Sequence, residues 1–485
     1  MPGSRSSNSW SPVRRSLLLC LLGIGMAACG GGGGGGSTTR PPDPTFDQGV
    51  FGFISTIVDA PTLAVTLFSS TSGGSSLTLP YGLGSLSVQT VAGFDVDILY
   101  ADANNETQHL LQRSGTDNIK LFRDDEKIVW LSGTLANPVV QIIENDEYLY
   151  GVDLTANPDN QPQVQFFNGV TGQGQLDIYL TAGAADLAGA TPLATLAESA
   201  FSPVIDVDAS TDYRLRATPA GDKTTVLYDS GTFGLASNTR TSIFAINYFG
   251  PGANAVTMRP LRRGAVVTFA NEVAPAQFRV RNVLADLDAI DVHVGTPGTT
   301  PVISALPFEG VSAYIDGTAG DQEINVTQEG ITDPVALQRT VTLAPGFVQT
   351  IFVGGLFTDG AQSDARNVVG NAGVEDRRPI AGLVRIEMFQ GSVAAGSKDI
   401  HFLDPGEDIA GNQQRVSLAL GGVASVELPP GDYDLAVTNQ GVTDTIILGP
   451  QRFSVAAGNY YTVLLEDAAG GGSPFSALIQ ATPLN

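Results

Sequence analysis

Cysteine and histidine are scarce in this sequence of 485 residues, which contains two Cys and three His. A structural zinc site takes four Cys or His ligands at close spacing, whereas His109, His293 and His401 lie far apart in the chain. A Ser-His-Asp site needs its three groups within hydrogen-bond distance, and no nucleophile-elbow motif is present. We therefore predict no zinc site, no catalytic residue and no enzymatic activity.

Positive charge is also in short supply. The chain has 25 Lys and Arg against 49 Asp and Glu, which gives a net charge of −24. Such an acidic protein repels phosphate backbones, so nucleic acid is excluded as a partner. Long apolar runs are missing as well, since the longest, residues 16–28, has 13 residues and a membrane-spanning helix needs about 20.

The N-terminal segment has the features of a secretory signal. Arg5, Arg14 and Arg15 precede the apolar run, and small residues precede Cys29. The run from Gly25 to Cys29 resembles the lipobox of bacterial lipoproteins, which implies cleavage after residue 28 and a diacylglycerol on the Cys29 thiol. The alternative is an ordinary signal peptide with a stray Cys. Because the mature chain keeps one Cys, we predict no disulfide framework.

The residues after Cys29 indicate where the protein is held. Residues 30–45 are rich in Gly and Pro, contain no core-forming side chain and predict a flexible tether. By resemblance to proteobacterial lipoproteins, Gly rather than Asp after the Cys implies the outer membrane. The expected membrane partner is therefore the lipid on Cys29, with the protein facing the periplasm or the outside.

Beyond residue 45 the sequence repeats. Short apolar runs alternate with Gly, Pro, Asp and Asn, which is typical of strands and turns. Asp177, Asp291 and Asp399 recur at spacings of 114 and 108 residues, and so do Trp130, Phe244 and Phe352. Repeats of this size predict an all-β chain of four tandem Ig-like antiparallel β-sandwiches, at 46–156, 157–262, 263–376 and 377–485, arranged in line as a rod.

Three motifs resemble a known family. They are Leu284–Val294 with its IDVHV strand, Phe308–Ser312, and the LPPGDYDLAVT run of Leu428–Thr438. Together they resemble the bacterial domain-of-unknown-function family DUF4397, most clearly across residues 266–485. The resemblance implies secreted or lipidated tandem β-sandwiches and no known activity, so it assigns no functional residue.

Calcium is the one metal that the composition leaves open, because oxygen ligands are plentiful. A solvated acidic surface is the competing interpretation and the one we favour, since no EF-hand loop is present. Asp95 and Asp97, two residues apart on a strand, are expected to share a face. The candidate ligands are Asp95, Asp97, Asp206, Asp208, Asp286, Asp288, Asp124, Asp125, Glu126, Asp404, Glu407 and Asp408.

Paired aromatic residues are the remaining candidates for ligand contacts. Neighbours on a strand point to opposite faces, so one of each pair is expected to be exposed. The candidates are Tyr148, Tyr150, Tyr248, Phe249, Tyr460 and Tyr461, of which Tyr248 and Tyr460 are singled out as speculative ligand contacts. His293 and His401 occupy matching strand positions and are predicted to be half-buried packing residues.

The sequence thus predicts a non-enzymatic lipoprotein of the cell envelope that displays β-sandwiches for structural or adhesive binding. A glycan or polymer capture module is the alternative. A hydrolase is a third possibility, for which the abundant acids give no specific signal. The partner is an unknown protein or glycan, and no cofactor is expected apart from weakly bound calcium.

Overall fold

The computed structural model describes residues 48–483, apart from 70–72, 91, 105, 123–124, 146–160, 238, 253–254, 263–268, 299, 358–368 and 412–414. Cys29, the Gly-rich tether, Asp124, Tyr148 and Tyr150 lie outside the described residues. The described chain is built from strands and two short 3-10 helices, η1 (Gly115–Asp117) and η2 (Ile409–Gly411). No helix within it is long and apolar enough to cross a membrane.

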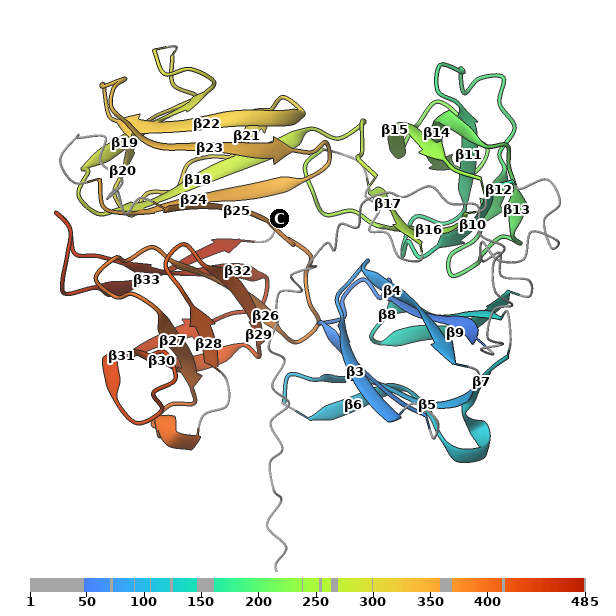
Figure 1. Cartoon of the computed structure of the whole chain (residues 1–485), viewed down its shortest axis with the longest axis horizontal. Helices are drawn as coiled ribbons and strands as arrows, with labels where there is room; N and C mark the ends of the chain where they lie inside the picture. Colours follow the sequence, from blue (N-terminus) through green and yellow to red (C-terminus); the bar gives the residue numbers. More distant parts are fainter. Residues whose placement is uncertain are drawn as a thin grey trace, which may run out of the picture.

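Eight sheets form four β-sandwiches, each with two sheets (Figure 1). One sheet of the first sandwich contains, in order, β4 (Gly84–Thr90), β1 (Gln48–Ser55), β8 (Glu126–Thr134) and β9 (Asn137–Asn145). The other sheet contains β3 (Gly73–Leu79), β2 (Leu63–Ser69), β5 (Ala92–Ala101) and β6 (Thr107–Arg113), and β7 (Ile119–Leu121) pairs with β5. The second contains β13 (Ile205–Asp206), β10 (Gln163–Asn168), β16 (Arg240–Asn247) and β17 (Val256–Leu261), and β12 (Ala194–Leu196), β11 (Leu176–Ala182), β14 (Ser210–Pro219) and β15 (Tyr228–Leu235).

The other two sandwiches repeat this strand order. The third contains β21 (Ile315–Gly317), β18 (Ala276–Leu284), β24 (Val348–Gly355) and β25 (Val369–Val374), and β20 (Ile303–Pro307), β19 (Ala289–Val294), β22 (Gly320–Gln328) and β23 (Val335–Leu343). The fourth contains β29 (Val423–Leu428), β26 (Val384–Gln390), β32 (Asn459–Glu466) and β33 (Ser476–Pro483), and β28 (Arg415–Leu418), β27 (Lys398–Leu403), β30 (Gly431–Asn439) and β31 (Ile446–Val455).

The predicted all-β fold of tandem sandwiches is confirmed, with one difference in detail. The first and the penultimate strand of each repeat run parallel at the centre of one sheet, as in β1 with β8 and β18 with β24. A parallel pair needs a long crossover, and here the strands between them, most of which build the other sheet, supply it. Each sandwich is therefore built from eight main strands, in one mixed and one antiparallel sheet, rather than from antiparallel sheets alone.

Each sandwich has its own apolar core, and a second set of cores joins the sandwiches in pairs. Trp130 of the first sandwich packs on Phe167 and Phe244 of the second, with ring centroids 5.3 and 6.0 Å away. Phe352 of the third and Phe389 of the fourth stack at 5.0 Å in the same way. The sheets that carry these residues are buried on both faces, which is why runs such as IVWL at 128–131 are continuously apolar.

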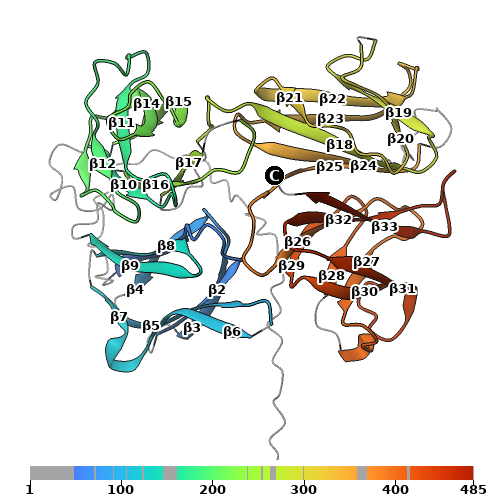
Figure 2. The same ribbon diagram turned by 180° about the vertical axis from the view of Figure 1, so that it is seen from behind.

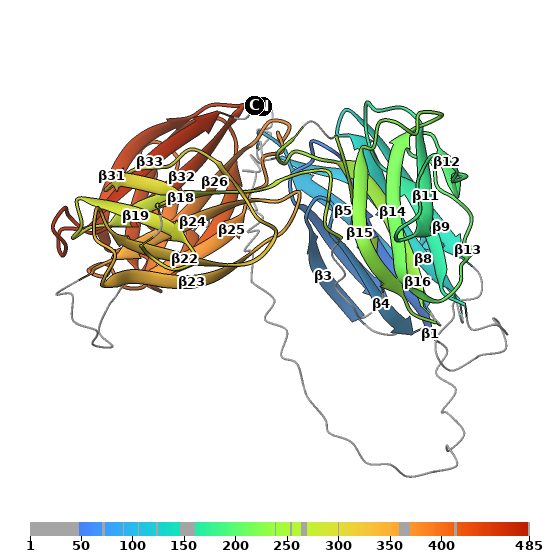
Figure 3. The same ribbon diagram turned by 90° about the horizontal axis from the view of Figure 1, so that it is seen from above.

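The four sandwiches lie two by two and not in line (Figures 1 and 2), so the predicted rod is wrong. Seen from above, the first two and the last two form separate halves (Figure 3). The halves are joined where Arg378 donates to the carbonyls of Val58 and Ala60, at 3.2 and 2.5 Å, and the Ala381 amide donates to Asp59 O at 2.8 Å. Large apolar residues at the repeated positions bury sheet faces between sandwiches, which places the sandwiches side by side in pairs.

Candidate functional site

The repeated Asp of the family motif holds a turn. Asp291 accepts hydrogen bonds from the amides of Ala305 and Gly330, at 2.8 and 2.9 Å. Gly330 has a φ of 71°, which suits glycine and is disfavoured for other residues. Asp177 and Asp399 make the matching contacts to Gly221 and Gly441, at 2.8 and 2.9 Å. This part of the motif therefore builds the turn before β15, β23 or β31 rather than a binding site.

The two histidines of the motif are also structural. His293 and His401 are 2 % and 0 % exposed, so they are fully buried and not half-buried as predicted. The His401 Nε2 lies 3.1 Å from Thr438 Oγ1, and the His293 Nε2 lies 3.4 Å from Thr327 Oγ1. At this burial neither ring is accessible to a substrate.

Most of the acidic candidates for calcium binding accept hydrogen bonds from other groups of the protein. Asp206 accepts from Gln163, Asp286 from the Phe357 amide, and Glu407 from the Asp404 amide. Across the residues that the structure describes, no group of three or more His, Cys, Asp or Glu side chains is placed to hold a metal ion. Weak calcium binding stays the untested alternative to a solvated acidic surface.

The paired tyrosines at the end of the chain do not offer a ligand surface. Tyr460 and Tyr461 are 4 % and 7 % exposed, and the Tyr460 hydroxyl donates to Glu387 Oε2 at 2.5 Å. The choice of Tyr460 as a ligand contact is therefore wrong, because both faces of its sheet are covered. Tyr248 and Phe249 are half-buried, and the Tyr248 hydroxyl donates to Pro251 O at 3.1 Å.

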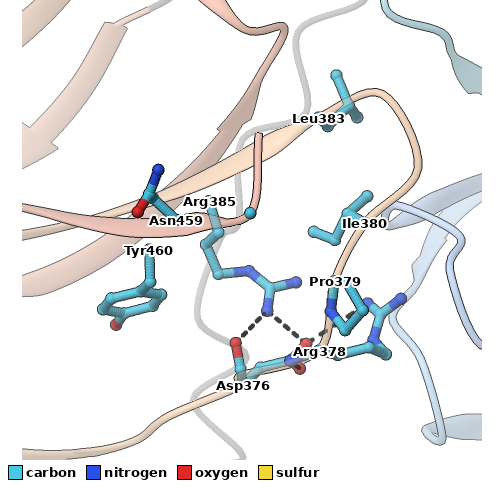
Figure 4. Close-up of a pocket in the computed structure, with 9 residues that line it drawn as sticks. Asp376, Arg378, Pro379, Ile380, Leu383, Arg385, Asn459 and Tyr460 are labelled. Atoms are coloured by element: carbon cyan, nitrogen blue, oxygen red, sulfur yellow. Dashed lines mark hydrogen bonds and ion pairs between the residues drawn. The ribbon is translucent and has the colours of Figure 1, made fainter. Parts of the chain in front are cut away.

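A small cavity beside Tyr460 lies at the junction of the domains (Figure 4). Arg385 pairs with Asp376 at 2.5 Å and with Glu427 at 2.7 Å, and Arg378 lies 3.4 Å from Asp376. Burial alone would raise the pKa of Asp376, but the two guanidinium groups hold it below its ordinary value. The cavity has a volume of about 30 Å³, room for about one or two water molecules. This junction fastens domains together and has no room for a sugar or peptide.

A wider depression lies on the first sandwich, on the outward face of the sheet β3-β2-β5-β6. We call it the outer trough. Its volume is about 550 Å³, and its lining includes Thr66, Phe68, Ser76, Asp95, Asp97 and Gln112. Phe68 is 54 % exposed. Asp95 and Asp97 share this face as the sequence predicted.

Both trough carboxylates are held in place from one side. Asp97 Oδ1 lies 2.7 Å from His109 Nδ1, and Asp95 Oδ1 accepts the Gly115 amide at 2.9 Å. Arg113, also in the lining, is engaged by Asp117 at 2.6 Å. The trough is therefore a preorganised acceptor surface with an aromatic ring beside it, suited to binding rather than to nucleophilic chemistry.

The trough is open because one connection is short. Three residues join β2 to β3, whereas 11, 8 and 11 residues join the matching strands of the second, third and fourth sandwiches. The longer connections lie on the outer face, where Ala185 accepts from Arg216 at 2.8 Å, Gly295 accepts from Asn325 at 2.8 Å, and Ile409 packs on Leu403 and Ala436. Thr66 is exposed at the position where Tyr179, His293 and His401 are buried.

Sequence reasoning missed Phe68, although a signal was present. Residues 64, 66 and 68 alternate outward on a strand that only three residues join to the next strand. The same alternation placed Asp95 and Asp97 on one face, because residues two apart on a strand point the same way. Tyr248 and Tyr460 lie on the second and fourth sandwiches, so the structure does not bring them to the trough.

The comparison with protein families confirms the predicted resemblance over one segment. Residues 276–401 match the family described as Domain of unknown function (DUF4397). The match covers the third sandwich and extends into β27 of the fourth. No curated protein matches the chain.

Solved structures give only distant likenesses. The Bacillus anthracis TIE protein is 10 % identical, with 82 % of this chain covering 66 % of that one at a TM-score of 0.15. Candidate cell adhesion proteins from Bacteroides uniformis and Bacteroides ovatus are 11 % and 12 % identical, each over 44 % of this chain and 98 % of theirs, with TM-scores of 0.14 and 0.13. At these TM-scores the likenesses carry no argument about function.

Proposed function

We propose that this chain is a non-enzymatic lipoprotein of the bacterial cell envelope that displays four β-sandwiches as one adhesive or structural block. The observation that carries the proposal is the closed arrangement of the sandwiches. Adjacent domains usually meet through polar surfaces and move relative to one another. Here Trp130, Phe244, Phe352 and Phe389 form buried apolar contacts between domains, which favour a single orientation.

The junction between the halves supports the same conclusion. Arg378 comes from the segment between the third and fourth sandwiches, yet its guanidinium lies 4.5 Å from the Tyr81 ring of the first. The Thr62 amide of the first sandwich donates to Glu427 of the fourth at 2.9 Å. A block closed in this way presents its outer faces in fixed positions, as a display protein requires.

The N-terminal segment supplies the proposed anchor. Two or more acyl chains hold a protein stably on a membrane, whereas one chain binds only marginally. A flexible chain with the length of residues 30–45 has a root-mean-square span of roughly 20–25 Å. The lipid on Cys29 would thus hold the block near the membrane and leave its surfaces free for a protein or glycan partner.

The test is to compare the full chain with its Cys29→Ser variant in a Gram-negative host. We expect palmitate labelling and outer-membrane fractionation of the parent, and loss of both in the variant. Cells that carry the parent are also expected to adhere to surfaces more than cells that carry the variant. Membrane association that survives Cys29→Ser without palmitate labelling would refute the anchor, and equal adhesion by the two strains would refute the adhesive role.

A further inference from the structure

The outer trough differs from the same face of the other sandwiches in chemistry as well as in access. In the second and fourth sandwiches, carboxylates on this face are engaged by arginines, as in Asp229 with Arg214 and Asp434 with Arg452. In the trough, Asp95 and Asp97 are held by an amide and an imidazole, through their Oδ1 atoms. A large aromatic side chain, Phe68, stands exposed beside them.

The trough extends across the strands of its sheet and carries polar groups that a sugar chain can bind. Residues of all four strands, β3, β2, β5 and β6, line it, and the lining includes the hydroxyl-bearing residues Thr66, Ser76 and Ser114. Hydroxyls and carboxylates are the hydrogen-bond partners of a sugar chain. An exposed aromatic ring can pack on the apolar face of a sugar and attract a nearby ammonium group.

Charge decides which sugar chain fits. The trough presents two carboxylates, Arg113 is engaged by Asp117, and the whole chain has a net charge of −24. This field repels acidic polysaccharides and attracts cations. Hydrogen bonds from an ammonium group to a carboxylate are also stronger than those between neutral groups.

We propose that the outer trough binds a polysaccharide whose sugars carry free amino groups. Phe68 packs on one sugar ring, and Asp95 and Asp97 accept hydrogen bonds from ammonium and hydroxyl groups. This inference rests on one part of the proposed function, namely that the block binds a partner. It names the surface and the chemical class of the partner.

The experiment uses the mature chain with Cys29→Ser, so that the result does not depend on lipid anchoring. Three probes are titrated by calorimetry: a glucosamine hexamer, an N-acetylglucosamine hexamer and an oligogalacturonate. The test variants are Phe68→Ala and the double variant Asp95→Asn/Asp97→Asn. Their controls are Phe122→Ala, which removes another exposed phenylalanine of the first sandwich (57 % exposed), and Asp316→Asn/Asp444→Asn, which removes the same charge elsewhere.

We expect the glucosamine hexamer to bind at least about tenfold more tightly than the acetylated one, and the oligogalacturonate not to bind. The double Asn variant should lose about tenfold in affinity and Phe68→Ala about fivefold. Both controls should stay within about twofold of the parent. Thermal unfolding of each variant checks that the fold is kept.

Three results would overturn the proposal. One is the absence of measurable binding to the glucosamine hexamer. Another is equal weakening by the trough and control variants, which would show attraction to net charge alone. The third is equal binding of the two hexamers with no effect of the Asn substitutions. The display role would survive each of these results, because its own test measures lipidation and adhesion.

Discussion

Glu387 makes the stability of the block depend on pH. Its carboxyl group is 7 % exposed, on β26, and burial raises its pKa from 4.5 to about 7. Its Oε2 accepts the hydroxyl of Tyr460, and Arg281 and Arg279 offset only part of the burial. The folded protein therefore prefers the protonated acid at a pH at which the unfolded chain is ionised.

The sign and size of the pH effect on stability follow from the difference between the pKa of Glu387 in the folded and in the unfolded chain. Below pH 4.5 Glu387 is protonated in both states and has no effect on stability. Between pH 4.5 and about 7 the unfolded chain loses its proton first, so stability falls as the pH rises. Above pH 7 the loss stays constant at roughly 3 kcal/mol, since each unit of pKa shift is worth about 1.4 kcal/mol. Most of that loss, about 2 kcal/mol, develops between pH 5 and pH 8.

Glu387→Gln keeps an acceptor for the Tyr460 hydroxyl and removes the ionisable group. The quantity to compare is the melting temperature of the variant minus that of the parent. We expect this difference to be about 4–8 °C larger at pH 8 than at pH 5. Differential scanning calorimetry of both proteins at each pH measures this. Burial also raises the pKa of Glu466, to about 8, but this group is present in both proteins and cancels in the comparison.

An exposed glutamate supplies the control. Glu329→Gln, on the loop after β22, should change the melting temperature equally little at both pH values. If the difference between Glu387→Gln and the parent is the same at pH 5 and pH 8, the burial argument for Glu387 is refuted.

Three further predictions concern the joints and the repeated turn. Trp130→Ala should cost about 3–5 kcal/mol and speed amide hydrogen exchange in β16, because the indole fills the space between two sandwiches. Arg378→Ala should separate the two halves and raise the radius of gyration measured by X-ray scattering. Asp399→Ala should lower the free energy of unfolding by about 2 kcal/mol in urea titrations, because the Gly441 amide and the Ser417 hydroxyl lose their acceptor.

Matched variants guard each of these results. If amide hydrogen exchange in β16 is as slow in Trp130→Ala as in the parent, Trp130 does not stabilise the contact between the first two sandwiches. Lys120→Ala removes an exposed cation from the first sandwich, and scattering that matches between it and Arg378→Ala would show that Arg378 does not hold the halves. For Asp399→Ala the comparison is the exposed Asp444→Ala, and similar unfolding curves would remove the turn-holding role.

The fold was predictable from the sequence because its signals are local. Period-two alternation and the spacing of Asp177, Asp291 and Asp399 marked the strands and the repeat, since side chains on a strand alternate between faces. The position of Asp95 and Asp97 on one face followed from the same rule. Tyr460 was misjudged because alternation shows which face a side chain takes and not what covers that face.

The sequence by itself determined the all-β fold, the repeat and the acidic surface, because strand period, turn residues and net charge are properties of neighbouring residues or of simple sums. Only the tertiary structure decided that Trp130 and Phe352 join sandwiches in pairs and that Arg378 closes the block. It also decided that Phe68 stands open while His293 and His401 are buried. These outcomes depend on contacts between residues that are distant in sequence, and on the length of a loop that covers one sheet and not another.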